Sequence, residues 1–169
     1  RQMCIRDSFI DNGADYTGAL QILKVILSYD YLWQNIRVKG GAYGCMSGFS
    51  RTGEGYFVSY RDPNLERTME VYEGIADYLR NFTVSDRDMN KYIIGTMSNI
   101  DQPMTPSAKG DRSFNLYMNK VSAETIKKER LQILEAGQED IRKLADVVEA
   151  VMKAEPVSYT HLTLPTNRE

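Results

Sequence analysis

The residues best suited to chemistry in this chain lie in one short stretch, Arg37–Gly44, which reads RVKGGAYG. Arg37 and Tyr43 stand six positions apart, across a junction that we predict to join a helix to a strand. A forked guanidinium and a phenol at such a junction could both donate hydrogen bonds to one acceptor, for example a peptide carbonyl. Gly40 and Gly41 would allow another backbone to approach closely, or would permit a positive φ.

A purely structural interpretation of the same stretch is also open. Arg37 could interact with the helix dipole at a glycine-rich helix end, while Tyr43 packs on the sheet. A phosphate-binding loop is a weaker alternative, because Lys39 precedes the glycines and the G-x-x-x-x-G-K-[S/T] pattern is absent. The spacing alone therefore leaves a ligand-binding pair and a capped helix end as alternatives.

The two ends of the chain are related through their coding. Arg1–Asp7 (RQMCIRD) can be encoded by CGT CAG ATG TGT ATA AGA GAC, whose reverse complement encodes VSYTHLT, the sequence of Val157–Thr163. Selection on protein chemistry would not produce this relation, so we interpret both ends as translated sequencing adapter. We expect residues 1–8 and 157–169 to be adapter-derived tails that pack poorly, and residues 9–156 to form one partial domain.

Few residues remain for metal binding or nucleophilic catalysis. The chain has one histidine, His161, and two cysteines, Cys4 and Cys45. A protein zinc site takes three or four ligands, so we expect no metal site in this chain. Cys45 is predicted to be a small buried residue on a strand, and without a histidine partner it is a poor nucleophile. We therefore predict no catalytic residue within the chain.

The apolar pattern predicts alternating helices and one hairpin. A helix opens at residues 17–18 with a wide apolar face and ends near residue 37; strands at 42–50 and 56–60 flank a glycine-containing turn. Asp62 followed by Pro63 predicts a helix with Asp62 as its N-cap. Residues 60–64 could instead position a ligand.

Four further helices are predicted towards the C-terminus. Ser85 caps the first, a short helix lies near 113–119, Ser122 caps the third, and the last carries Ile141, Leu144, Val148 and Val151 on one face before Pro156. Residues 102–110 are predicted to be a loop, in which residues 105–110 could line a cleft.

This element order predicts an α+β fold. A two-stranded hairpin is marginal alone, and its open edges invite aggregation. So many amphipathic helices need a wider sheet, so we expect a mostly antiparallel but truncated sheet, packed with about six helices.

The overall composition excludes some classes of partner. Lys and Arg number 21, Asp and Glu 23, and the net charge of −2 provides no basic surface for nucleic acid. No apolar run approaches the ~18–20 residues of a membrane span, so no membrane partner is expected. No export signal is visible, from which we expect a cytoplasmic protein.

Several motifs together resemble one peptidase family. Residues 31–79, with RVKGGAYG and then SYRDPN, and KYIIGTMSNID at 91–101, resemble the C-terminal region of presequence-protease-like zinc metallopeptidases of the insulinase/pitrilysin family. The resemblance continues through TPSAKG to the last helix. It implies a domain of the type found in insulinase and in the mitochondrial processing peptidase.

The resemblance also implies a function. The intact enzyme would degrade unfolded peptides, with zinc and a catalytic glutamate from an H-x-x-E-H motif in its N-terminal half. This chain would be an inactive, substrate-binding part that needs that N-terminal half as its partner. Arg37 and Tyr43 match the family's substrate-contacting Arg and Tyr, with Gly40 and Gly41 between them. The alternative is a non-catalytic scaffold or peptide-binding subunit on the same fold.

Overall fold

Four strands form one antiparallel sheet in the computed structural model, which describes residues 2–153, 155 and 157–159. The spatial order is β2-β3-β1-β4, so β2 and β4 are the outer strands. Their bounds are β1 (Gln2–Ser8), β2 (Gly44–Phe49), β3 (Glu54–Tyr60) and β4 (Val157–Tyr159). The predicted hairpin is therefore confirmed as β2–β3, and two further strands widen it.

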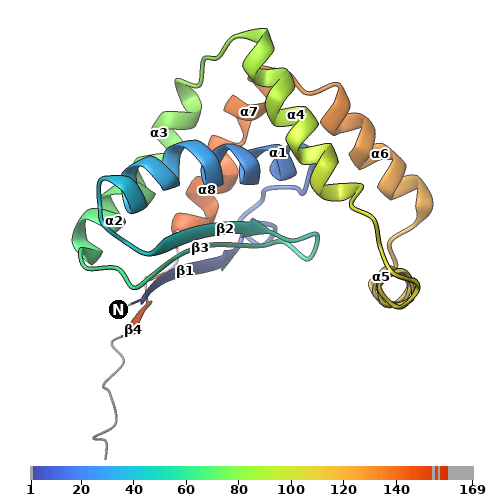
Figure 1. Ribbon diagram of the computed structural model, residues 1–169, viewed down its shortest axis with the longest axis horizontal. Coiled ribbons are helices and arrows are strands. Elements are labelled where there is room, and N and C mark those ends of the chain that lie inside the picture. The colour runs from blue at the N-terminus through green and yellow to red at the C-terminus, as the bar shows by residue number, and fades with distance from the viewer. Residues whose placement is uncertain (1, 154, 156, 160–169) are drawn as a thin grey trace, which may run out of the picture.

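Most of the helices lie over one face of this sheet (Figure 1). A long helical stretch begins with α1 (Ala19–Ile26) and continues through two π-helical segments, η1 (Leu27–Tyr31) and η2 (Trp33–Val38). The other helices are α2 (Leu65–Glu73), α3 (Ile75–Arg80), α4 (Asp86–Ile100), α5 (Pro106–Met118), α6 (Ala123–Leu134), α7 (Gln138–Lys143) and α8 (Ala145–Met152). Single-residue breaks at Gly74 and Leu144 separate α2 from α3 and α7 from α8, so each of these pairs corresponds to one predicted helix. With α1 and its π-helical continuation counted as one, the arrangement agrees with the predicted six helices.

The expectation that the chain ends pack poorly is wrong for residues 2–8. All seven residues of β1 pair with β3, and three of them also pair with β4. Met3 and Ile5 point into the core and are 7% and 0% exposed, because side chains alternate between the two faces of a strand. Residues 157–159 form β4, and residues 160–169 lie outside the described part. The adapter interpretation of the coding is a separate matter and stays a prediction.

Two of the predicted helix starts are confirmed and two segments are corrected. Ser85 and Ser122 cap α4 and α6, each accepting a bond from a backbone N–H three residues on. The cap of α2 is Asn64, not Asp62. Residues 106–110 are the first part of α5, not a loop, because Pro106 suits the first helical position and Thr105 caps it.

The core lies between the sheet and the helices. The predicted faces of the first and last helices are buried, with Leu20, Leu23 and Leu27 from one and Ile141, Val148 and Val151 from the other all fully enclosed. The expected stop of the last helix at Pro156 falls outside the described residues. Trp33, further along the same helical stretch, is 37% exposed and lies outside the core.

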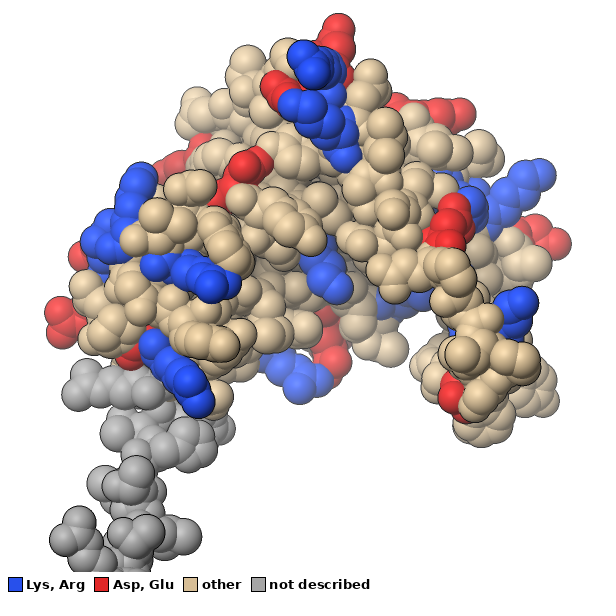
Figure 2. Space-filling view, in the orientation of Figure 1, with Lys and Arg blue, Asp and Glu red and all other residues tan. Residues whose placement is uncertain are grey.

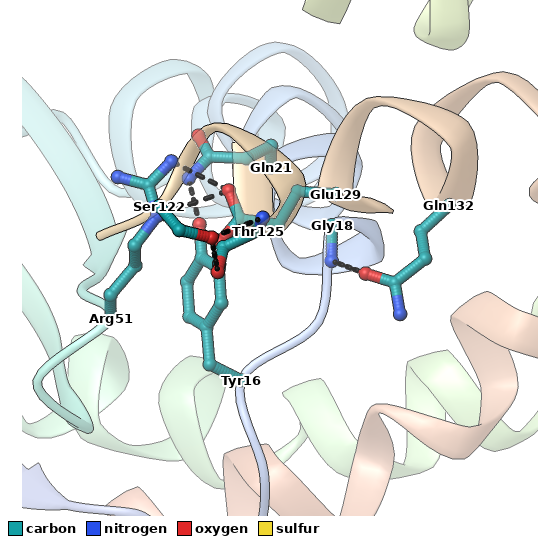
Figure 3. A network of polar contacts seen from close by, with 8 residues as sticks. All are labelled: Tyr16, Gly18, Gln21, Arg51, Ser122, Thr125, Glu129 and Gln132. Atoms are coloured by element: carbon teal, nitrogen blue, oxygen red, sulfur yellow. Dashed lines mark hydrogen bonds and ion pairs between the residues drawn. The ribbon is translucent and has the colours of Figure 1, made fainter. Parts of the chain in front are cut away.

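A partly buried ion pair fixes the hairpin turn to the helical layer (Figure 3). The Arg51 Nε and Nη2 donate to both carboxylate oxygens of Glu129 on α6, at 2.6–3.0 Å. The Arg51 guanidinium carbon also lies 5.8 Å from the centre of the Tyr16 ring, whose hydroxyl accepts a bond from Gln21 on α1. The turn that follows β2 is thereby held against α1 and α6.

Candidate functional site

The junction between η2 and β2 is closed by one glycine in a left-handed conformation. Gly41 has φ of +78° and donates its backbone N–H to the carbonyl of Arg37 at 3.0 Å. A left-handed glycine is the usual way to end a helix, because a side chain there would clash with the backbone. The predicted positive φ is thus confirmed at Gly41. It turns the chain from the helix towards β2, and Tyr43 is the residue directly before that strand.

Arg37 and Tyr43 meet on the surface within a group of aromatic rings and cations. The guanidinium carbon of Arg37 lies 4.0 Å from the centre of the Trp33 ring and 6.0 Å from that of Tyr43. The guanidinium carbon of Arg61 lies 5.2 Å from the same Tyr43 ring. We call Trp33, Arg37, Tyr43, Tyr60 and Arg61 the Tyr43 cluster.

The Tyr43 cluster is open to solvent. Tyr43 is 58% exposed, and Arg37 and Arg61 are exposed as well. Tyr43 is therefore not a core residue, although its ring lies against that of Tyr60 on the sheet, with the ring centres 5.6 Å apart. Arg37 does stack on a neighbouring ring, but its guanidinium N–H groups can still reach a ligand.

The two cations of the cluster are not neutralised internally. The ion pairs found among the described residues involve other arginines and lysines, and none includes Arg37 or Arg61. Two guanidinium groups next to a phenol supply only hydrogen-bond donors and positive charge, apart from the phenol's own oxygen. Such a surface is complementary to a carbonyl or to an oxygen that carries negative charge.

The sheet and one buried carboxylate hold the cluster in place. The Tyr60 ring lies across Gly44, where a Cβ would come within 2.4 Å of ring atoms, and its centre is 5.6 Å from that of Tyr43. Asp62 is 2% exposed and accepts hydrogen bonds from the hydroxyls of Ser59 and Thr68, each at 2.7 Å. Residues 60–64, which the sequence offered as a ligand-positioning segment, thus contribute Tyr60 and Arg61 to the cluster.

Gly40 and Gly41 have local structural reasons to be small. A Cβ on Gly40 would lie 2.5 Å from the carbonyl oxygen of Ile36, in the same helical stretch. A Cβ on Gly41 would meet only Pro63, at 3.6 Å, so the positive φ is what limits that position. The predicted contact of either glycine with a substrate strand stays a prediction.

Cys45 occupies a strand next to the cluster but is a poor nucleophile. Burial raises the pKa of its thiol to about 11, although the positive charge of Arg37 acts in the opposite direction. The thiol is half-buried and stays protonated at neutral pH, which deprives it of the reactive thiolate. In residues 2–153, 155 and 157–159, no three His, Cys, Asp or Glu side chains are grouped so that they could hold a metal ion.

A separate cleft of about 710 Å³ was missed by the sequence analysis. It lies among α4, α5, α6 and the hairpin turn, and is lined by several amides and three arginines: Asn99, Asn115, Asn119, Arg51, Arg112 and Arg130. The residues that line it come from four distant segments without a shared sequence motif. Residues 105–110, proposed as a cleft lining, do not take part in it.

The charged side chains elsewhere are mixed in sign. Figure 2 shows Lys and Arg interspersed with Asp and Glu over the face drawn. None of the described helices combines the length and the apolarity needed to cross a bilayer.

Comparison with known proteins identifies the family of this chain. A family model described as the PreP C-terminal domain matches residues 4–159. The chain belongs to this family. Protein HypA of Clostridium perfringens is 46% identical over 142 residues, and Presequence protease 1 (chloroplastic/mitochondrial) of Arabidopsis thaliana is 34% identical over 140 residues. These alignments cover 84% and 82% of this chain.

Solved structures confirm the fold of this family member. A protein from Bordetella pertussis Tohama I, named as a zinc protease, superposes with a TM-score of 0.68 at 14% identity, covering 94% of this chain and 93% of that one. A peptidase M16 inactive domain from Pseudomonas fluorescens gives a TM-score of 0.60 at 16% identity, covering 91% of this chain and 37% of that one. The predicted α+β, metallopeptidase-type domain is thus confirmed.

The chain is short beside its relatives. It spans 15% of the Clostridium protein and 13% of the Arabidopsis protein. The family match establishes that the chain is a PreP C-terminal domain related to peptidases. Because the chain spans so little of its relatives, the activity of a whole protein is a matter for proposal.

Proposed function

We propose that this chain is the substrate-binding C-terminal part of a zinc metalloendopeptidase that degrades unfolded peptides, and that it is inactive alone. The observation that carries the proposal is the exposed Tyr43 beside the guanidinium of Arg37, which forms none of the ion pairs found among the described residues. Both belong to the RVKGGAYG motif, in a chain of a family whose named relatives include presequence proteases.

Arg37 and Tyr43 would bind and polarise the substrate. Both side chains can donate hydrogen bonds to a peptide carbonyl, and neither needs a general base to do so. When the carbonyl oxygen gains negative charge, a donor aimed at it binds more strongly, so the pair would favour the transition state over the bound substrate.

The zinc of such an enzyme does not fit the residues described here, since they contain no grouped set of metal ligands. Zinc would supply a polarised water from another part of the intact protein. The N-terminal half of the same enzyme would be the partner that holds it. A cytoplasmic location stays a prediction; the named relatives from Arabidopsis thaliana and Yarrowia lipolytica are chloroplastic/mitochondrial and mitochondrial.

A non-catalytic subunit on the same fold is the second candidate. One solved neighbour is named as an inactive domain of a peptidase, which favours it. The upstream coding sequence distinguishes the two, because the enzyme requires an H-x-x-E-H motif there and the scaffold does not.

The test is kinetic and uses the intact enzyme. Tyr43→Phe or Arg37→Ala should lower kcat by roughly 10²–10³, the usual effect of losing one donor to an oxyanion, with a smaller change in KM. Zinc content should not change. If KM rises while kcat holds, the pair binds substrate uniformly; if only the melting temperature falls, both residues are structural.

The chain alone provides a second test. A metal assay and an unfolded-peptide digest of the 169-residue chain should show neither stoichiometric zinc nor cleavage. Tight one-to-one zinc, or cleavage that a chelator stops, would overturn the assignment of the metal site to another part of the enzyme.

A further inference from the structure

Arg61 adopts a backbone conformation that an arginine rarely adopts. Its φ is +48°, in the left-handed region, where a Cβ crowds the following carbonyl. The only other non-glycine residue with a positive φ among those described is Lys120, which directly follows the cap of α5. A left-handed residue is common at that place. Arg61 instead follows the last residue of β3, Tyr60, so a helix end does not explain its conformation.

The surrounding structure holds Arg61 in this conformation from both sides. Before it, β2 and β3 pair as far as Gly44 and Tyr60, and the Tyr43 N–H then donates to the Arg61 carbonyl at 3.3 Å. After it, Asp62 is buried, and its carboxylate also accepts the N–H of Asn64 at 2.9 Å. Unfavourable backbone conformations persist where the neighbours over-determine them, and they cluster at functional sites.

The side chain of Arg61 is directed to Tyr43. Its guanidinium carbon lies 5.2 Å from the centre of the Tyr43 ring, within the range of a cation–π interaction. Arg61 forms none of the ion pairs found in the described residues. Its contribution to the packing of the core is small, because the side chain is exposed. A glycine would adopt this backbone more easily, at the cost of the whole exposed side chain with its guanidinium.

We propose that Arg61 is a positioning residue of the Tyr43 cluster, which restricts the Tyr43 ring so that its hydroxyl faces the substrate carbonyl. Tyr43 is 58% exposed, so its ring would otherwise sample several rotamers. The Tyr60 ring of the sheet and the guanidinium of Arg61 both lie against it, and together they would restrain it. This inference rests on the proposed function for its effect on activity, but the restraint on the ring can be measured in the chain itself.

The first test measures the restraint in the 169-residue chain. Arg61→Gly should leave the melting temperature unchanged or raise it, since glycine relieves the left-handed backbone. In Arg61→Gly, the chemical shifts of the Tyr43 ring in an NMR spectrum should move towards those of a tyrosine in an unstructured peptide. The Tyr43 ring signals are assigned by their loss in Tyr43→Phe. Arg61→Lys is the matched control, because it keeps the cation and should keep the ring signals. Unchanged ring signals in Arg61→Gly would overturn the proposal.

The second test measures the consequence in the intact enzyme. Arg61→Gly should lower kcat about two- to fivefold, the effect expected from one exposed cation–π contact, while KM holds and Arg61→Lys retains most of the rate. In an enzyme that already carries Tyr43→Phe, Arg61→Gly should cause no further loss, because no phenol remains to be positioned. Equal losses in both backgrounds would overturn the proposal by showing a direct contact with substrate.

The two tests separate this proposal from the proposed function. If Tyr43→Phe leaves kcat unchanged, the proposed function fails, and the ring signals still decide whether Arg61 restrains Tyr43. If Tyr43→Phe lowers kcat and Arg61→Gly leaves both kcat and the ring signals unchanged, only the role of Arg61 is overturned.

Discussion

Replacing Ile5 tests whether the first residues of the chain belong to the fold. Ile5 is 0% exposed on β1, opposite Phe57 on β3, and α8 packs against the same strand. Ile5→Ala removes a buried side chain and leaves a cavity, which should lower the free energy of unfolding by about 2–5 kcal/mol. A domain of this size is stable by about 5–15 kcal/mol, so the loss should be plain in a urea titration.

The neighbouring residue supplies the control. Arg6 lies on the other face of β1, and its ion pair with Glu54 is exposed, with side-chain exposures of 60% and 48%. Arg6→Ala should therefore leave the free energy of unfolding nearly unchanged, because an exposed ion pair contributes little to stability. Unfolding is followed by far-ultraviolet circular dichroism and by the fluorescence of Trp33, the single tryptophan.

The contrast between the two variants decides the matter. If residues 2–8 were a detached tail, Ile5→Ala and Arg6→Ala would have equal and negligible effects, and the inclusion of β1 in the sheet would be refuted. Deleting residues 1–8 should then also leave the melting temperature unchanged. We expect instead that this deletion abolishes cooperative unfolding, because it removes the strand between β3 and β4.

Three other measurements follow from the buried and exposed side chains. In a Cys4→Ser background, alkylation of Cys45 near pH 8 should be at least about tenfold slower than that of a thiol with the ordinary pKa of 9.0, since burial raises the pKa of Cys45 to about 11 and the greater nucleophilicity of its thiolate offsets only part of the smaller thiolate fraction; a rate equal to that of glutathione would contradict its burial. Asp62→Ala leaves the hydroxyls of Ser59 and Thr68 without their acceptor, which should lower the free energy of unfolding by about 1–3 kcal/mol for each of them. Adding Thr68→Val should recover part of this loss, because it removes one of the two unpaired hydroxyls. Phe114→Ser on α5 should alter the free energy of unfolding by less than about 0.5 kcal/mol, because Phe114 is 62% exposed and no residue of α5 is buried; a larger loss would show that α5 packs more closely against the rest of the chain.

The sequence determined the helices with strong caps and clear apolar periodicity. Ser85 and Ser122 begin helices as predicted, and the buried faces of the first and last helices are those that the 3.6-residue period selects. The hairpin was equally clear, because alternation and a glycine-containing turn are local signals. The residues of RVKGGAYG could also be singled out, since their types and spacing are unusual.

Local signals failed where a residue had two competing uses. Asp62 before Pro63 has the pattern of an N-cap, but its carboxylate is buried and accepts bonds from Ser59 and Thr68, so Asn64 caps α2 instead. Those partners come from a strand and from the next helix. No window around Asp62 contains that information, because the contact exists only after β3 and α2 have packed.

The strand β1 shows most clearly what only the tertiary structure decided. The coding relation between the chain ends gave reason to exclude residues 2–8 from the fold, yet Met3 and Ile5 alternate with polar neighbours as a half-buried strand requires. The open edge of a hairpin presents unpaired backbone N–H and C=O groups, which can pair with a strand of any sequence. The alternation of apolar side chains in the added strand then sets its register. The Tyr43 cluster has the same origin: Trp33, Tyr43 and Arg61 come from three elements, and only the turn at Gly41 and the pairing of β2 with β3 bring them together.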